Sequence, residues 1–409
     1  GNEGKIRRKL IENGYIDTII GLPAGIFFRT GIATIIMVLR KNRKNRDIQF
    51  IDGSKLFTKY SSTNRMEVSH IRKIVDAYIE KKDIAKFSKI ASFEEIKEND
   101  FNLNISRYID SFEKDDFHDL YASLHGGIPN TELDNFSDFW ASMPNIKEIL
   151  LKPLDAKYSE FKDKENIYQT ILDHPDTQAY LEKYSNVVKK LKEFLRQKLG
   201  NFNDIKNIRI ENLADEFDNF FFDNISQIKM LDKYELYQEA ITTFKDIKTD
   251  LYNILANIDN QDNHLYFDVF ANNLTIEKVY FANELEDIET LKADIEEKES
   301  QIKEIAPDND NEENLDDEQS FEVKKIKNKI KTLKASHKKL VQDFNAKKQS
   351  KIDSIDTDEF IELLHIKWSD NLSKSILEKG NDVINSQIAK LEKLAKKYDQ
   401  TLAQIDEEI

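Results

Sequence analysis

The sequence concentrates positive charge in one short segment, Arg40-Lys-Asn-Arg-Lys-Asn-Arg46, which contains no acidic residue. Its five cations are Arg40, Lys41, Arg43, Lys44 and Arg46. Arginine and lysine on a tight loop suit contacts with phosphate groups, which position a protein on a nucleic acid without reading its sequence. The alternative is a solvated loop whose charge keeps a sheet edge from pairing with another chain. The sequence leaves both interpretations open.

Other side chains give little sign of catalytic or metal chemistry. The chain has no cysteine, which excludes disulfides, zinc-thiolate sites and thiol nucleophiles. The histidines show neither metal-ligand spacing nor a Ser/His/Asp order. They are His70, His118, His125, His174, His264, His337 and His365. The acidic run at 308–317 lacks the glycine and final spacing of a calcium loop, so a solvated linker is favoured. We therefore predict no metal site.

Charge is distributed unevenly along the 409 residues, whose net charge is −15. Residues 1–90 hold 19 Lys and Arg against 9 Asp and Glu, so the first quarter carries +10 and the remainder −25. An anionic partner should therefore meet the first quarter of the chain. The longest apolar run, Ile32–Leu39, is too short to span a bilayer, and no secretory leader opens the chain. We expect a cytoplasmic protein with no membrane partner.

Three short strands are predicted near the start, at Asp17–Pro23, Ile32–Leu39 and Asp47–Asp52, after an opening helix that stops at Asn13-Gly14. The run Ile32–Leu39 does not alternate, and a strand that is apolar on both faces needs cover on both faces, as in the middle of an α/β sheet. These few elements cannot supply that cover. We expect the sequence to begin inside a larger domain.

From residue 61 the pattern is largely helical. Heptad spacing on both sides of an acidic loop at 307–320 predicts an antiparallel coiled-coil hairpin, which could pair with itself or with a partner's helices. The last stretch predicts two helices split at Gly380. The fold class is therefore mainly α: helical domains and a coiled-coil hairpin, with a small α/β part at the N-terminus.

Several segments resemble the long form of the M (modification) subunit of type I restriction-modification systems. They occur in the family's order over residues 1–240. The segments are Asn2-Glu-Gly-Lys-Ile-Arg-Arg-Lys-Leu-Ile-Glu-Asn13, Ile20-Gly-Leu-Pro-Ala-Gly-Ile-Phe-Phe-Arg-Thr-Gly-Ile32, Asp100-Phe-Asn-Leu-Asn-Ile-Ser-Arg-Tyr-Ile-Asp110, Gly126-Gly-Ile-Pro129 with Phe139-Trp140, and Leu231-Asp-Lys-Tyr-Glu-Leu-Tyr-Gln238.

The resemblance implies adenine-N6 methylation of DNA in the intact subunit, with S-adenosylmethionine as the methyl donor. It also implies four partners: DNA, a specificity subunit, a motor-nuclease subunit and a second M subunit. The N-terminal strands would then be a remnant of a Rossmann-like methyltransferase sheet. In this family helical contacts help to hold the specificity subunit, so we favour a coiled-coil hairpin that also docks there.

The chain departs from the family where the chemistry would occur. It has no Gly-x-Gly for the glycine-rich turn at the donor, and no two of its six prolines adjoin, so the Asn/Asp-Pro-Pro-aromatic loop is absent. We therefore predict no catalytic residue and no cofactor in this fragment, which alone should not transfer a methyl group.

Two candidate contacts follow from the resemblance. Phe27 or Phe28, in the loop after the first strand, could border an adenine rotated out of the duplex; the alternative, which we favour, is that both rings pack under the sheet. Arg107-Tyr108 could reach DNA or the specificity subunit; we favour a tail clamped on the methyltransferase region, with Asn102 and Asn104 satisfying backbone groups.

The interpretation divides the chain into five parts. They are 1–60, the incomplete C-terminal strands of a methyltransferase domain; 61–112, its helical tail; 113–280, a helical domain; 281–350, the coiled-coil hairpin; and 351–409, the C-terminal helices. The function predicted is DNA contact and subunit assembly as a fragment of the methyltransferase subunit. The alternative is a purely structural helical scaffold without a DNA role.

Overall fold

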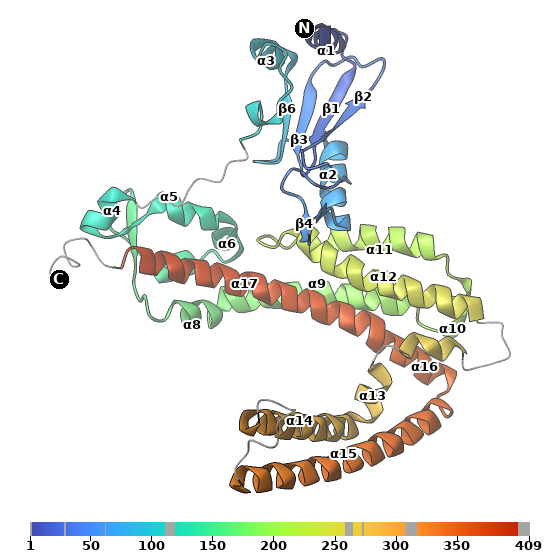
Figure 1. The fold of residues 1–409 in the computed structure, drawn as a ribbon. Helices are drawn as coiled ribbons and strands as arrows, with labels where there is room; N and C mark the ends of the chain where they lie inside the picture. The colour runs from blue at the N-terminus through green and yellow to red at the C-terminus, as the bar shows by residue number, and fades with distance from the viewer. Residues whose placement is uncertain are drawn as a thin grey trace. The chain divides into compact units, whose positions relative to one another are not determined.

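Figure 1 shows the fold in the computed structural model of the chain, which describes residues 2–27, 30–61, 63–110, 119–257, 265–271, 274–306 and 317–399. The chain divides into two compact units. Unit 1 contains Gly1–Lys190, Phe217–Thr242 and Lys374–Ile409, and unit 2 contains Leu191–Glu216 and Thr243–Ser373. Helices dominate, which confirms the predicted mainly α fold with a small α/β part at the N-terminus. Within the described ranges, no helix combines the length and apolar character needed to cross a bilayer.

Unit 1 begins with a four-stranded sheet in the order β2-β1-β3-β6. The two central strands run parallel, with Thr18 opposite Gln49, and the outer strands are antiparallel to their neighbours. The strands are β1 (Ile16–Gly21), β2 (Ile35–Leu39), β3 (Ile48–Asp52) and β6 (Ser88–Ala91). The first three match the predicted strands, whereas β6 lies in sequence predicted to be helical.

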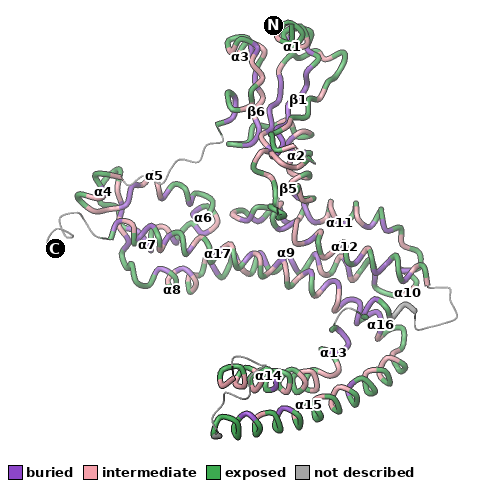
Figure 2. The backbone as a smooth tube through the Cα atoms, in the orientation of Figure 1, coloured by how far each residue is buried: buried purple, intermediate pink, exposed green. Residues whose placement is uncertain are grey.

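Helices cover the central strands on both faces. One face packs on α1 (Asn2–Glu12) and α3 (Phe93–Glu98) through Ile11 and Ile96. The other packs on α2 (Val68–Glu80) through Ile74. All six residues of β1 are buried, the polar Asp17 and Thr18 included (Figure 2).

The edge strand β2 lacks such cover. The exposed fractions are 56% for Ile35, 47% for Ile36, 38% for Met37 and 56% for Leu39. Among the described residues no strand pairs with the free edge of β2. This exposure agrees with the expectation that these elements cannot cover the strand, and its interior position in a larger sheet stays a prediction. A bare apolar edge is a site for pairing with further protein.

The rest of unit 1 combines short and long helices with a small sheet that the sequence did not reveal. Its strands follow the order β7-β9-β8 and span Ile128–Pro129, Tyr158–Phe161 and Leu151–Pro153. The helices are α4 (Leu120–His125), α5 (Asn130–Leu133), α6 (Ser137–Ser142), α7 (Ile146–Leu150), α8 (Ile167–Leu172) and α9 (Pro175–Lys198). Strands of two to four residues leave no alternation to detect.

The final helix, α17 (Asn371–Lys397), runs through Gly380 without a break, so the predicted split there is wrong. The reason for the glycine is close packing against α9. A Cβ on Gly380 would lie 2.1 Å from Cε1 of Tyr184, whose side chain is buried. The Tyr184 hydroxyl also donates a hydrogen bond to the carbonyl of Ile376.

Unit 2 has a buried polar centre on Asp250. The carboxylate accepts a 2.7 Å hydrogen bond from Nε1 of Trp368 and lies 2.7 Å from Nζ of Lys367. Both partners sit on a π-helical turn, Ile366–Asp370. The helices that contribute residues to this unit include α10 (Phe202–Asn207), α11 (Ile210–Ile225), α12 (Lys233–Asn257), α13 (Thr275–Tyr280) and α16 (Thr357–His365).

Unit 2 also contains an antiparallel helical hairpin, α14 (Ala282–Ile305) and α15 (Asp317–Ile352). Ion pairs cross it at both ends, Lys334 to Glu299 at 2.6 Å and Lys347 to Glu284 at 3.1 Å. Its buried side chains are Ile295, Val323, Ile330 and Phe344. The two helices are antiparallel, as predicted. That they form a coiled coil and that they dock on a specificity subunit stay predictions. Residues 307–316 of the predicted acidic loop lie outside the described residues, and 317–320 already belong to α15.

Candidate nucleic-acid interface

Asp17 organises the cationic loop that follows β2. Its carboxylate is 3% exposed and lies 2.8 Å from Nζ of Lys81 and 3.2 Å from Nε of Arg43. Thr18 Oγ1 donates to it at 3.0 Å. Burial raises the pKa of Asp17, but the hydrogen bond and charge of Lys81, the Thr18 hydroxyl and the charge of Arg43 outweigh burial and hold the pKa below its ordinary value. The carboxylate is therefore charged at neutral pH and fixes the start of the loop.

The structure divides the five predicted cations by their contacts. Arg43 is largely buried and donates to the carbonyls of Ile16 and, at 2.7 Å, Asp47. The guanidinium of Arg46 lies 3.7 Å from the centre of the Phe93 ring. Arg40 is 3.8 Å from Asp17 with 59% of its side chain exposed. Arg43 thus holds the loop in place and is poorly suited to reach an outside phosphate, whereas Arg46 rests on Phe93 and stays exposed.

Lys41 and Lys44 are the cations of this loop that remain available. Both side chains are exposed, and the contacts between described residues give neither an ion-pair partner. Between them Asn42 adopts a left-handed conformation (φ 58°) that tightens the loop. If the loop contacts phosphate, these two lysines should carry the contact.

This division predicts different outcomes for two sets of variants. Lys41→Gln with Lys44→Gln should lower the slope of log affinity against log salt by about 2, since each lost phosphate contact removes about 0.9. The same double variant should keep its stability. Arg43→Gln should instead lower the free energy of unfolding by about 2 kcal/mol, because it removes one partner of a largely buried pair. Salt titrations of DNA binding and urea unfolding measure the two effects; an unchanged slope in the lysine variant would remove the phosphate role.

The loop after β1 presents Phe27 to solvent. Its ring is 53% exposed, and the backbone at Phe27 forms a single bridge to Thr30. Packing of Phe27 under the sheet, which we favoured from the sequence, is therefore wrong for this ring. Phe28 lies outside the described residues. The loop is tied to β5 (Thr63–Arg65), because Nδ2 of Asn64 donates to the carbonyl of Ala24 at 2.8 Å.

Arg107 and Tyr108 point to different environments. Tyr108 is 5% exposed and stacks on Phe50 with ring centres 4.0 Å apart, and its hydroxyl donates to the carbonyl of Asn102. Asn102 Oδ1 accepts from the backbone N–H of Asn104 at 2.8 Å. Arg107 is exposed at the end of a short 3₁₀ turn. The segment is thus fixed to the sheet by Tyr108, which leaves Arg107 as its candidate for an outside contact.

The segment Leu231–Gln238 lies against α2 within unit 1. Asp232 pairs with Lys73 at 2.9 Å, and the hydroxyl of Tyr234 donates to Asp76 at 3.0 Å. Gln238 accepts from the backbone N–H of Ser69 at 3.2 Å. Burial, with the charge of Asp76, raises the pKa of Tyr234, so its hydroxyl stays a donor. These contacts give the segment a structural role that the sequence alone did not reveal.

Residues able to hold a metal ion do not cluster in the part of the chain that the structure describes. His365 is buried, and burial together with the charge of Arg196 lowers its pKa. His337 is half-buried on α15. His118 and His264 lie outside the described residues. A buried neutral histidine inside a helical packing layer is a structural group.

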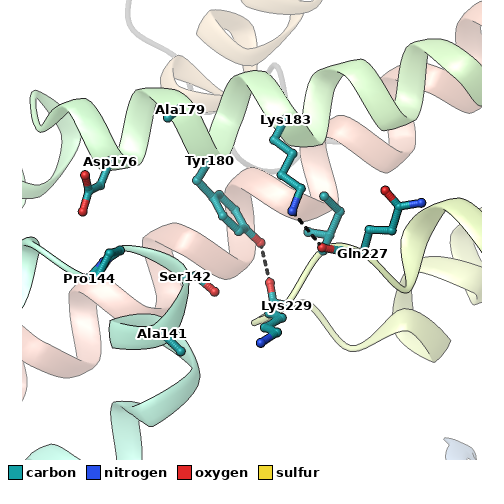
Figure 3. A pocket seen from close by; sticks show the side chains of 10 residues that line it. Ala141, Ser142, Pro144, Asp176, Ala179, Tyr180, Lys183, Gln227 and Lys229 are labelled. Carbon is teal, nitrogen blue, oxygen red and sulfur yellow. Dashed lines mark hydrogen bonds between the residues drawn. The ribbon is translucent and has the colours of Figure 1, made fainter.

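An open cavity of about 450 Å³ lies between α6, α9 and the turn after α11 (Figure 3). Its polar groups are bonded to neighbouring parts of the protein. The Tyr180 hydroxyl donates to the carbonyl of Lys229 at 2.8 Å, and Lys183 Nζ donates to the carbonyl of Gln227 at 3.1 Å. Asp176 accepts from both the backbone and the side chain of Asn145. The cavity therefore offers a ligand few polar groups to bind.

The chain packs closely around Gly21 and Gly53 at the carboxyl ends of β1 and β3, the edge at which parallel sheets bind nucleotides. A Cβ on Gly21 would lie 2.8 Å from Cδ1 of Ile105, and one on Gly53 would lie 2.7 Å from the Gly21 carbonyl oxygen. Asp52 caps the backbone N–H of Ser54. These contacts leave no room for a methyl group at Gly21 or Gly53. That this chain holds no methyl donor stays a prediction.

The first part of the chain is similar to known proteins. Residues 1–117 match the family described as N-6 DNA Methylase. The chain is 40% identical over 112 residues to the type I restriction enzyme MpnII methylase subunit of Mycoplasma pneumoniae. The aligned region covers 27% of this chain and 21% of that protein. It is 39% identical over 115 residues to the MjaVII methylase subunit of Methanocaldococcus jannaschii, with 27% and 20% covered.

A solved structure, a type I restriction-modification system methyltransferase subunit from Streptococcus thermophilus, is 57% identical and covers 27% of this chain and 24% of that one, with a TM-score of 0.27. The aligned segment spans about a fifth of the length of the curated relatives. The predicted resemblance to type I methylase subunits is confirmed. The family match ends at residue 117, so the resemblance of the segments at 126–140 and 231–238 stays a prediction.

Proposed function

We propose, because residues 1–117 match the N-6 DNA Methylase family, that this chain is the C-terminal part of a type I restriction-modification DNA methyltransferase subunit. In the intact subunit the reaction is adenine-N6 methylation with S-adenosylmethionine. The chain contributes DNA contact and subunit assembly, and its partners are DNA, the specificity subunit, the motor-nuclease subunit and a second M subunit. The donor site and the chemistry lie in sequence outside this chain.

One observation carries this proposal: the bare strand β2 at the edge of a methylase-type sheet. Four of its five side chains, all apolar, are 38–56% exposed. On α2, Ile71 and Ile79 are also apolar and exposed, with exposed fractions of 51% and 69%. Exposed apolar groups in such number are costly in water and mark a surface that another part of the protein covers. The missing strands of a methyltransferase sheet fit this edge in both hydrogen bonding and apolarity.

The DNA side of the proposal rests on the exposed Phe27 and on exposed cations elsewhere on the N-terminal sheet. A ring that is half exposed suits stacking on a base rotated out of the duplex. The basic loop at 40–46 lies at the opposite end of β1 from the Phe27 loop, because Ile16 pairs with Leu39 and Gly21 with Ile35. Lys41, Lys44 and Arg107 are exposed cations that would bind phosphate. The same proposal includes the five predicted parts of the chain, with boundaries after residues 60, 112, 280 and 350.

The test is reconstitution of methyl transfer from labelled S-adenosylmethionine to DNA. The chain alone should transfer no methyl group, and the chain combined with the preceding methylase segment and the specificity subunit should do so. Ile36→Asp with Met37→Lys should abolish association with the methylase segment, because it puts charge on the strand that has to be covered. Phe321→Lys, at an apolar side chain 72% exposed on α15, is the matched control and should associate normally.

Three outcomes count against the proposal. Methyl transfer by the chain alone would place the donor site inside it. Normal association and transfer by the β2 variant would show that the strand is not an assembly surface. If the chain fails to bind duplex DNA at low salt but still binds the specificity subunit, this result would favour the structural scaffold without a DNA role.

A further inference from the structure

A second element beside the Phe27 loop has the chemistry of a DNA contact. It is the hairpin of β4 (Thr58–Tyr60) and β5 (Thr63–Arg65), which follows β3 and is drawn at the far end of α2 in Figure 1. Tyr60 pairs with Thr63 across a tight turn in which Ser61 is left-handed (φ 48°). The three residues of β4 are all exposed, so the sheet core gains nothing from their side chains.

The hairpin is bonded directly to the loop that carries Phe27. Asn64 donates twice, from Nδ2 to the carbonyl of Ala24 at 2.8 Å and from its backbone N–H to the carbonyl of Gly25 at 3.2 Å. Gly25 is left-handed (φ 69°), which turns both carbonyls toward the hairpin. Asn64 thereby sets the position of the Phe27 loop relative to the hairpin.

The exposed side chains of the hairpin are aromatic and cationic. Tyr60 is 50% exposed, and the guanidinium of Arg65 lies 5.6 Å from the centre of its ring. Lys59 is exposed on the neighbouring position. Residues 55–65, which include the hairpin, hold three Lys and Arg and no acid, in a chain whose net charge is −15. Stacking rings with adjacent cations are the means by which proteins hold an unpaired nucleic-acid strand.

We propose that the β4–β5 hairpin is a second DNA-contacting element, which holds the strand that bears the target base. Lys59 and Arg65 bind phosphates, and Tyr60 stacks on a base or sugar next to the one at Phe27. Asn64 is a positioning residue that keeps the two contacts in register. The inference rests on the proposed function, because it assumes that the Phe27 loop meets DNA.

The charge contribution is tested by salt titration of the complete 409-residue chain with a labelled single strand of about 30 nucleotides. Lys59→Gln with Arg65→Gln should lower the salt slope by about 1.4, because each single-strand phosphate contact contributes about 0.7. Tyr60→Ala should weaken binding roughly fivefold, through loss of one stack. The matched control is Lys292→Gln with Lys374→Gln, two side chains 68% and 74% exposed, which should leave slope and affinity unchanged.

The positioning role of Asn64 needs a separate readout. Asn64→Ala and Asn64→Asp both remove the donor to Ala24, and both should at least halve the quenching of a 2-aminopurine base placed in the strand. Their salt slope should stay that of the unaltered chain, because the cations remain. A fall in slope and quenching together would indicate a loss of folding and would overturn the positioning role.

The hairpin proposal fails if its charge variant behaves like the control, or if the unaltered chain binds no DNA at low salt. Methyl transfer in the reconstituted subunit is a separate measurement. Transfer that survives all the hairpin substitutions would overturn the hairpin's role while leaving the proposed function in place. Loss of transfer in the β2 variant, with hairpin-dependent DNA binding retained, would support both.

Discussion

Gly380→Ala is expected to lower the free energy of unfolding of unit 1 by about 2–3 kcal/mol, a cost typical of overpacking a buried contact. The added methyl group would lie 2.1 Å from Cε1 and 2.8 Å from the hydroxyl oxygen of Tyr184. Tyr184 is 1% exposed and cannot swing aside without opening the contact between α9 and α17. Its hydroxyl bond to the carbonyl of Ile376 would be lost in the same movement. Urea unfolding and hydrogen exchange of α17 amides measure the effect.

The expected loss of stability in Gly380→Ala is opposite to what helix propensity alone predicts. In an exposed helix, glycine to alanine stabilises by up to about 1 kcal/mol. Gly4→Ala in α1 is the matched control, because a Cβ there meets no atom within 4 Å, and it should be neutral or stabilising. Tyr184→Ala with Gly380→Ala should be no less stable than Tyr184→Ala alone, since removing the ring removes the clash. Stabilisation by Gly380→Ala would contradict the packing argument.

Asp17→Asn should destabilise the N-terminal sheet by about 2–4 kcal/mol, because it leaves the cations around a buried carboxylate without their counter-charge. Arg43 is the most affected, with 15% of its side chain exposed, and Lys81 follows at 33%. Glu94→Gln, at a carboxylate 71% exposed and 3.8 Å from Lys97, is the control and should change stability by less than about 0.5 kcal/mol. Equal stability of the two variants would remove the central role of Asp17.

The pH dependence gives a second measurement on the same residue. The pKa of Asp17 is lower in the folded chain than its ordinary value of 3.8. The stabilisation by the carboxylate is therefore fully present above about pH 3.8 and is lost as the pH falls through the folded pKa. The unaltered chain should thus lose stability on acidification more steeply than Asp17→Asn, and the two curves should approach each other below that pH. Parallel curves would show that Asp17 has the same pKa folded and unfolded.

Gly380 and Arg43 show why the sequence could not predict every local role. A glycine favours the end of a helix, so the sequence predicts a break at Gly380. The residue that Gly380 packs against, Tyr184, lies almost 200 residues away in the sequence. The sequence does not distinguish the five cations at 40–46. In the structure, Arg43 contacts Asp17, Ile16 and Asp47, whereas Lys41 and Lys44 are exposed. Long-range contacts decide in both cases.

The sequence by itself determined the mainly α class, the strands β1 to β3, the direction of the helical hairpin and the family of the first quarter. Each of these depends on periodicity, on charge along the chain or on contiguous motifs, which folding does not alter. Only the tertiary structure decided that β2 is a bare edge, that Phe27 is exposed, that Asn64 ties the β4–β5 hairpin to the Phe27 loop, and that Leu231–Gln238 packs on α2. Burial and pairing between distant residues depend on the whole packing arrangement, and no local pattern specifies them.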